Sequence, residues 1–350
     1  MKYPAKLSVF ILACTGLGAA CAQGSVTLYG LLDTGIEYVS HADAKGASAA
    51  WRMSPGNTSG SRWGLRGKED LGGGLAGIFT LESGFASDSG ASLQGGRLFG
   101  RQAWVGLEGR WGRLTLGRQT NVLFDLIPQF DPVRYMTYSL LSQDAQFTGR
   151  ADNAVKYSGD FGAMTVVGMY SAGYDASIVN GGEVPGNYRV GQEMGLGARY
   201  TQNRFAVAVA YDQRHGTTAA AASAIERRYV AAAGYDFGKF GLSAGYRHLQ
   251  NSIAIPNYRA NLYWFGASTD LTPRLALRGG IYWNDQYRTP NDALSYVITA
   301  QYSLSKRTLG YVNASYMDNR GKSSVGVALG SSAAAGVGQT GVVAGIKHVF

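Results

Sequence analysis

Apolar and polar residues alternate along most of the chain with a period of two, which is the signature of a β-strand with one apolar face. In the first such run, Val26, Leu28 and Ile36 occupy even-numbered positions, so they point to one face of the strand. Asp33 and Glu37 occupy odd-numbered positions and point to the other face, and we call this even or odd assignment the parity of a residue. Further runs of the same kind lie at residues 205–212, 275–284 and 294–302. The pattern therefore predicts an all-β chain.

Two kinds of connection separate these runs. Seven are short turns with Gly, Asp or Pro, near residues 70–74, 109–112, 160–163, 201–204, 236–239, 271–274 and 303–306. Eight are longer polar segments, near residues 41–60, 86–97, 119–152, 175–189, 216–226, 251–257, 288–291 and 319–338. Such connections join 16 strands, and their long–short alternation is typical of an antiparallel transmembrane β-barrel. A soluble sandwich or propeller, the alternative, gives no reason for that alternation.

The composition agrees with strands that have two different faces. Only 16% of the 350 residues are charged, against ~25% in ordinary soluble domains. The mean hydropathy of −0.09 is too low for a protein made of membrane helices. Both values follow if half of each strand faces lipid and the other half faces water.

The N-terminal residues 1–22 have the three parts of a secretory signal peptide. Lys2 and Lys6 precede an apolar stretch, and a small-residue site ends at Ala22. Cleavage there removes both cysteines, lowers the net charge from +9 to +7 and leaves residues 23–350 as one barrel domain. A lipoprotein signal with Cys21 as the lipidated residue is the alternative. A large exported chain without cysteine indicates the Gram-negative envelope.

Six motifs are distinctive in combination: VTLYG at 26–30, SRWGLRG at 61–67, EDLGGGL at 69–75, RQAWVGL at 101–107, GRQ at 117–119 and HVF at 348–350. Together they resemble the trimeric general diffusion porins of Gram-negative bacteria, in particular the betaproteobacterial group. The resemblance implies a 16-stranded barrel in the outer membrane, assembled as a homotrimer. Each barrel would hold a water-filled pore for passive diffusion of ions and small hydrophilic solutes. A substrate-specific outer-membrane channel is the alternative.

The third long segment, residues 119–152, is the longest connection in the chain. Segments of this length are usually functional or disordered. In the resembled family this loop folds inward and narrows the channel opposite a basic wall. We therefore expect a constriction loop here whose acids line the narrow passage, namely Asp125, Asp131 and Asp144. Solvated loop acids without that role are the alternative.

Parity assigns a set of basic side chains to the lumen. Trp63 and Leu65 are predicted to face lipid, so Arg62, Arg66 and Lys68 point to the other side of the same strand. A lipid-facing Arg or Lys would cost ~2–4 kcal/mol at the bilayer midplane. With a net charge of +7, weak anion preference is our hypothesis.

Two further arginines need a separate argument. Arg101 has the parity opposite to Trp104 and is expected to join the basic wall. Arg118 shares the parity of Leu114 and Leu116, which would place it in lipid. We expect a β-bulge or the strand end to turn Arg118 away from the lipid.

Other functions are not favoured by the sequence. The four histidines are scattered, so we expect no metal site. We identify no Ser–His pair of the kind that an outer-membrane hydrolase needs, and we expect no cofactor. The basic residues form no single run, so nucleic acid is not an expected partner. Apolar residues alternate up to Phe350, which looks like the signal read by the barrel-assembly machinery. That machinery, outer-membrane lipid and lipopolysaccharide are the other expected partners.

Overall fold

The computed structural model describes residues 25–175 and 183–350, so the expected signal peptide lies outside the described residues. Within them, 17 β-strands form one antiparallel sheet. Their bounds are β1 Ser25–Val39, β2 Ala50–Pro55, β3 Arg62–Gly72, β4 Leu75–Gly84, β5 Gln102–Gly109, β6 Gly112–Thr120, β7 Arg150–Phe161, β8 Met164–Ser171, β9 Glu193–Gln202, β10 Phe205–His215, β11 Ile225–Asp236, β12 Phe240–Asn251, β13 Tyr258–Thr272, β14 Leu275–Gln286, β15 Ala293–Ser303, β16 Thr308–Asn319 and β17 Gln339–Val349.

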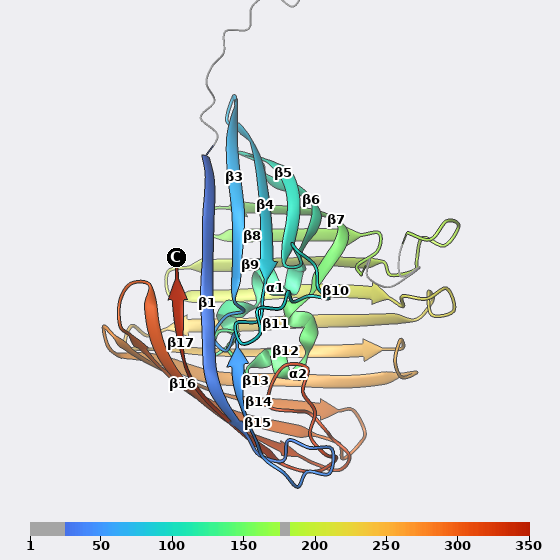
Figure 1. The fold of residues 1–350 in the computed structure, drawn as a ribbon. Helices are drawn as coiled ribbons and strands as arrows, with labels where there is room; N and C mark the ends of the chain where they lie inside the picture. The colour runs from blue at the N-terminus through green and yellow to red at the C-terminus, as the bar shows by residue number, and fades with distance from the viewer. Residues whose placement is uncertain (1–24, 176–182) are drawn as a thin grey trace, which may run out of the picture.

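The sheet closes on itself as a barrel (Figure 1) because β1 pairs with β17 from Leu31 opposite Val349 to Val39 opposite Gly341. Residues 34–39 of β1 also pair with β2, and residues 25–31 pair with β3. β2 and β3 therefore share one position in the wall, and the predicted 16-stranded antiparallel barrel is confirmed.

The connections follow the predicted alternation of short and long. Those after β3, β5, β7, β9, β11, β13 and β15 have two to four residues, and the others are longer. One prediction was partly wrong, since the segment 41–60 contains β2. β2 runs antiparallel to β1, with Trp51 opposite Tyr38 and Met53 opposite Ile36. The Trp51 ring lies 5.1 Å from the ring of Tyr38. The strand was hidden in the sequence because its apolar run is only a few residues long and a polar, Gly- and Ser-rich stretch follows it.

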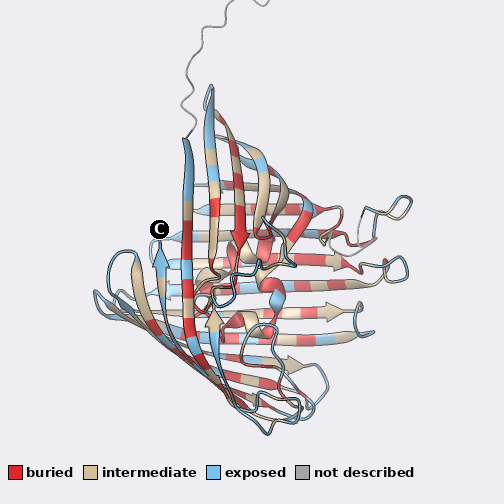
Figure 2. Cartoon of the chain, viewed as in Figure 1, coloured by how far each residue is buried: buried red, intermediate tan, exposed pale blue. Residues whose placement is uncertain are grey.

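The two faces of the strands differ as their alternation predicts (Figure 2). In β1, Val26 and Ile36 are 62% and 60% exposed on the outer face. Asp33 and Glu37 are 0% and 1% exposed on the inner face. No helix among the described residues is long and apolar enough to cross a membrane.

The chain ends at the seam of the barrel. Phe350 and Gly30 exchange two backbone hydrogen bonds, with N–O distances of 3.0 and 3.2 Å. A Cβ atom on Gly30 would collide with the Phe350 ring and with the backbone oxygen of Arg62. The terminal aromatic ring therefore occupies space that only a glycine in β1 leaves open.

Four short helices lie in the third long segment: α1 Val122–Leu126, η1 Pro128–Phe130, α2 Leu140–Gln143 and η2 Ala145–Thr148. Asn121 caps α1 by accepting a hydrogen bond from the Phe124 amide, and Ser139 caps α2 in the same way through the Leu141 amide. We call residues 121–149 the loop segment. Its helices keep most of its backbone hydrogen bonds internal, which lets it leave the sheet.

Candidate functional site

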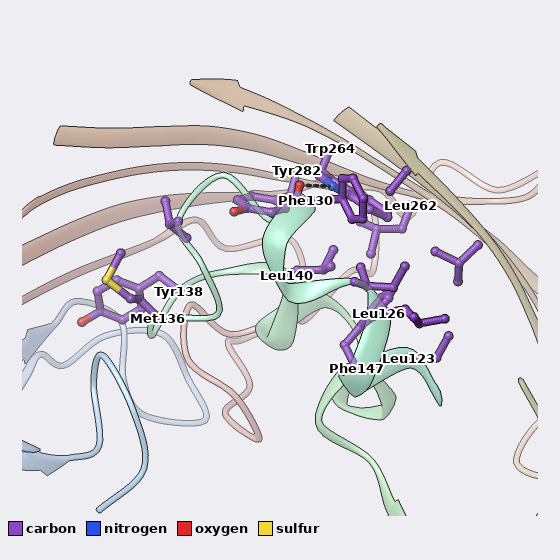
Figure 3. Close-up of a cluster of buried hydrophobic side chains, with 14 of the residues drawn as sticks. Leu123, Leu126, Phe130, Met136, Tyr138, Leu140, Phe147, Leu262, Trp264 and Tyr282 are labelled. Carbon is purple, nitrogen blue, oxygen red and sulfur yellow. Dashed lines mark hydrogen bonds between the residues drawn. The ribbon is translucent and has the colours of Figure 1, made fainter. Parts of the chain in front are cut away.

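The loop segment packs against the inner face of the barrel wall (Figure 3). Trp264 of β13 faces inward, since its neighbours Tyr263 and Phe265 are exposed on the outside. The indole Nε1 of Trp264 donates a 2.9 Å hydrogen bond to the carbonyl oxygen of Phe130. Nearby, Pro132 lies against wall positions that hold only glycine. Together with fully buried Leu123, Leu126 and Phe147, these contacts form an apolar anchor.

A polar anchor holds the other half of the loop segment. The Asp144 carboxylate accepts two hydrogen bonds from Arg228, at 2.8 and 3.0 Å, and lies 3.2 Å from Nε of Arg247. Gln146 donates to Glu193 and Asp212 at 3.0 and 3.2 Å. Burial raises the pKa of Asp144, but the Arg228 and Arg247 guanidinium groups outweigh it and hold that pKa at about 2.

Asp131 is buried and forms no ion pair with any residue that the structure describes. Its carboxylate accepts hydrogen bonds from the hydroxyl of Tyr282 and from the amide of Tyr135, the latter at 2.7 Å. Burial raises the pKa of Asp131 to about 6. Tyr138 donates to Glu37 of β1 at 2.8 Å, so the loop segment also reaches β1 at the seam of the barrel.

The three predicted loop acids therefore differ in their surroundings. Asp131 and Asp144 lie beneath the loop segment, so neither carboxylate faces the open channel. Sequence reasoning placed them at the passage because their burial depends on partners in distant strands. Asp125 lies at the edge of the segment, where it accepts hydrogen bonds from Lys156 at 2.7 Å and Thr120 at 2.6 Å.

The structure places Arg62, Arg66 and Lys68 on the inner face of β3, as parity predicts. Arg66 stands opposite Thr80 of β4, and its guanidinium lies 5.3 Å from the ring of Tyr29. Lys68 forms a 2.6 Å ion pair with Glu108 of β5. Arg62 lies 3.8 Å from the carboxylate of Glu82.

Arg101 is also on the inside, but the argument used for it was wrong. Trp104 stands opposite inward-facing Thr80, so it faces the lumen and not the lipid. Arg101 precedes the first residue of β5 and is free of the strand's alternation. It turns inward because its Nε forms a buried 2.6 Å ion pair with Glu82.

The predicted irregularity at Arg118 is confirmed. The pairing of β6 with β7 shifts register between Gly117 and Gln119, and Gly117 has a φ of +124°. Arg118 donates to Asp152 at 2.6 Å and to the carbonyl oxygen of Gly100 at 2.7 Å. It is therefore part of a polar network at the end of β6 and does not join Glu82.

Arg150 is a functional candidate that sequence reasoning missed. It begins β7, and its guanidinium lies 5.4 Å from the ring of Phe124 in the loop segment. With Arg62 and Arg101 it lines a cavity of about 380 Å³ in which Glu82 is the one acidic side chain. We call Arg62, Arg101 and Arg150 the arginine cluster. The signal for Arg150 was the alternating run that follows it, but residue 150 fell inside the predicted loop 119–152, where parity was not applied.

Comparison with known proteins places these features in a family. The chain matches the model of the Gram-negative porin family over residues 9–322. It belongs to that family. This porin is 33% identical to an outer membrane porin protein of Bordetella pertussis, over 86% of this chain and 91% of the relative. It is 31% identical to outer membrane porin protein 32 of Delftia acidovorans, over 95% and 96% of the two chains.

Solved structures share the architecture of this porin. An anion-selective porin from Comamonas acidovorans superposes with a TM-score of 0.81 and 27% identity, over 93% of this chain and 100% of that one. A trimer form of OmpT from Vibrio cholerae has a TM-score of 0.67 at 13% identity, which shows the fold alone. The protein is thus an outer-membrane porin of the Gram-negative type, whose barrel forms a water-filled channel for ions and small hydrophilic solutes.

Proposed function

We propose that this porin is a weakly anion-selective diffusion channel, in which the loop segment narrows the passage opposite the arginine cluster. The observation that carries the proposal is the charge of one cavity, where three guanidinium groups meet a single acidic side chain. Phe124 of the loop segment lines the same cavity. The segment and the cations therefore border one aqueous space.

The fixed charges on the two sides of the loop segment do not cancel in the channel. Asp144 is bound to Arg228 and Arg247 beneath the segment, and Asp125 is bound to Lys156. The arginine cluster keeps a net positive charge beside water, which raises the local concentration of anions. The Comamonas porin, which is described as anion-selective, supports this direction.

Assembly and maturation are part of the same proposal. We infer that the chain is cleaved after Ala22, that Phe350 addresses it to the barrel-assembly machinery, and that it forms a homotrimer. Exposed apolar side chains such as Trp51 and Met53 provide an outer face for a second copy, lipid or lipopolysaccharide. The channel would carry no catalytic activity and need no cofactor.

Reversal potentials in a KCl gradient across planar bilayers test the selectivity. The wild-type channel should prefer chloride. Arg62→Gln and Arg150→Gln should each lower local anion occupancy roughly fourfold, the effect of a unit charge about 5 Å away in water. Arg320→Gln, on an exposed pair far from the cavity, is the control and should change nothing. A wild-type channel that prefers potassium would overturn the proposal.

A further inference from the structure

A second cavity adjoins the arginine cluster on the inner wall. The two cavities share Gln102 and Thr120 in their linings, so they lie next to each other. The second has a volume of about 300 Å³, at the lower end of the range for small-molecule sites. Among its lining residues are Trp104, the basic side chains Arg113, Lys156 and Arg199, and the acids Asp125 and Asp160. We call it the tryptophan recess.

The indole of Trp104 is fixed in place on the lumen side of the wall. Its neighbour Val105 is 59% exposed on the opposite, outer face. The indole Nε1 donates a 2.8 Å hydrogen bond to Gln102, two residues earlier on the same face of β5. Gly117, the residue opposite on β6, carries no side chain, and a Cβ there would collide with the backbone oxygen of Ala103. An ordered aromatic ring thus borders an aqueous cavity, and β6 places no side chain directly beside it.

The cations of the recess are only partly neutralised. Lys156 is paired with Asp125 at 2.7 Å. Arg199 forms one hydrogen bond, 3.4 Å long, to the Thr165 hydroxyl. The Arg113 guanidinium forms no hydrogen bond or ion pair within residues 25–175 and 183–350, although Glu108 stands opposite Arg113 on β5. The recess therefore combines an aromatic face with a guanidinium group that is free to bind a carboxylate.

We propose that the tryptophan recess binds organic anions that carry a planar aromatic ring, which stacks on Trp104 while the carboxylate reaches Arg113. The inference rests on the proposed anion-conducting channel, since the solute enters past the arginine cluster. Stacking favours a ring with a π face over a saturated ring of similar size and equal charge. A purely structural Trp104 would not distinguish the two.

Single-channel recording with benzoate and with cyclohexanecarboxylate tests this distinction. In the wild-type channel, benzoate should interrupt the current about three to ten times longer per event than cyclohexanecarboxylate, the ratio that an aromatic pair provides. Trp104→Leu should abolish this difference, and Trp104→Phe should retain part of it. Trp63→Leu, which removes an indole from the outer face of β3, is the matched control and should behave as wild type.

Arg113→Gln should weaken block by both acids, because both carry the carboxylate. Equal block of the wild-type channel by the two acids would overturn the inference, and this result does not depend on any variant folding. Unchanged benzoate preference in Trp104→Leu channels of normal chloride conductance would also overturn it. The KCl reversal potential, measured in the same membranes, reports on the proposed anion selectivity separately from ring preference.

Discussion

The two walls of this porin use the same kinds of charged residue for different purposes. On the wall formed by β9–β14, the loop segment covers Arg228 and Arg247 and matches them with Asp144. On the wall formed by β3–β7, Arg62 and Arg150 border an open cavity. The covered wall holds the loop segment in place, and the open wall gives the channel its charge.

Solvation explains the difference. A charge that loses its water must be paired, because an unpaired buried ion costs several kcal/mol. A charge that borders a water-filled cavity keeps part of its hydration and therefore needs less pairing. Coverage by the loop segment, and not residue type, therefore decides which arginines act on passing ions.

The largest expected effect comes from breaking the polar anchor. Asp144→Ala leaves Arg247 buried without its carboxylate, whereas Arg228 keeps its 2.6 Å ion pair with Glu226. The change should lower the free energy of unfolding by ~3 kcal/mol or more. Thermal unfolding in detergent measures the loss, and the current through single channels should become noisier as the segment loosens. Asp318→Ala removes an exposed acid paired with Arg320 and should cost less than ~1 kcal/mol. Equal losses in the two variants would contradict the comparison.

The pH dependence of the free energy of unfolding tests whether Asp131 is buried at the apolar anchor. Its pKa rises from 3.8 in the unfolded chain to about 6 in the folded one. The folded protein therefore takes up the proton first and gains stability as the pH falls from about 6 to 3.8. Above pH 6, keeping the buried carboxylate ionised costs about 3 kcal/mol. Unfolding measured between pH 4 and 7 should show this slope in the wild type.

Asp131→Asn should flatten that slope, because the titrating group is gone. Asp144 provides the opposite control. With a pKa of about 2, it stabilises the fold above pH 3.8, and that contribution is lost as the pH falls through about 2. A wild-type stability that falls steadily from pH 6 to 4 would contradict the assignment of Asp131.

A substitution at Gly117, where β6 shifts register against β7, should have a smaller effect on stability. Gly117→Ala places a Cβ against the backbone of Ala103 at a left-handed position, which should cost ~1–3 kcal/mol and disturb the Arg118–Asp152 pair. Gly95 also has a positive φ, but nothing lies within 4 Å of the position its Cβ would take. Gly95→Ala therefore carries the backbone strain without the collision. Equal losses of stability in the two variants would show that the close contact at Gly117 has no role.

The smallest effect is expected at the edge of the open wall. Arg66 is exposed and does not line the cavity of the arginine cluster. Its charge is screened by salt over about 10 Å at 0.1 M. Arg66→Gln should shift the KCl reversal potential by less than half as much as Arg62→Gln. An equal shift would extend the selective region along the whole of β3.

Parity was sufficient to place side chains where the lipid face of a regular strand was read correctly. Arg62, Arg66 and Lys68 could be assigned to the lumen from Trp63 and Leu65 alone, because a strand fixes the direction of each second residue. The same rule failed for Trp104, since an aromatic residue was taken as evidence of a lipid face. Aromatic rings also suit a water-filled lumen, so residue type by itself was ambiguous there.

The loop segment could be found from the sequence, but its contacts could not. Its length and position were evident, whereas the partners of Asp144 lie 84 residues away at Arg228 and farther at Arg247. Burial of Asp131 likewise depends on Tyr282, 151 residues distant. No local pattern reports which wall a loop will cover.

The sequence alone determined the barrel, the 16 strand positions in its wall, the order of short and long connections and the inner face of strands such as β1 and β3. These follow from local rules, namely period-two alternation, turn residues and the cost of a charge in lipid. Only the tertiary structure decided which charges are covered and which remain beside water. That outcome depends on how the loop segment folds back onto distant strands, where burial makes pairing obligatory, whereas the three arginines of the cluster share Glu82 as the one acidic side chain of their cavity.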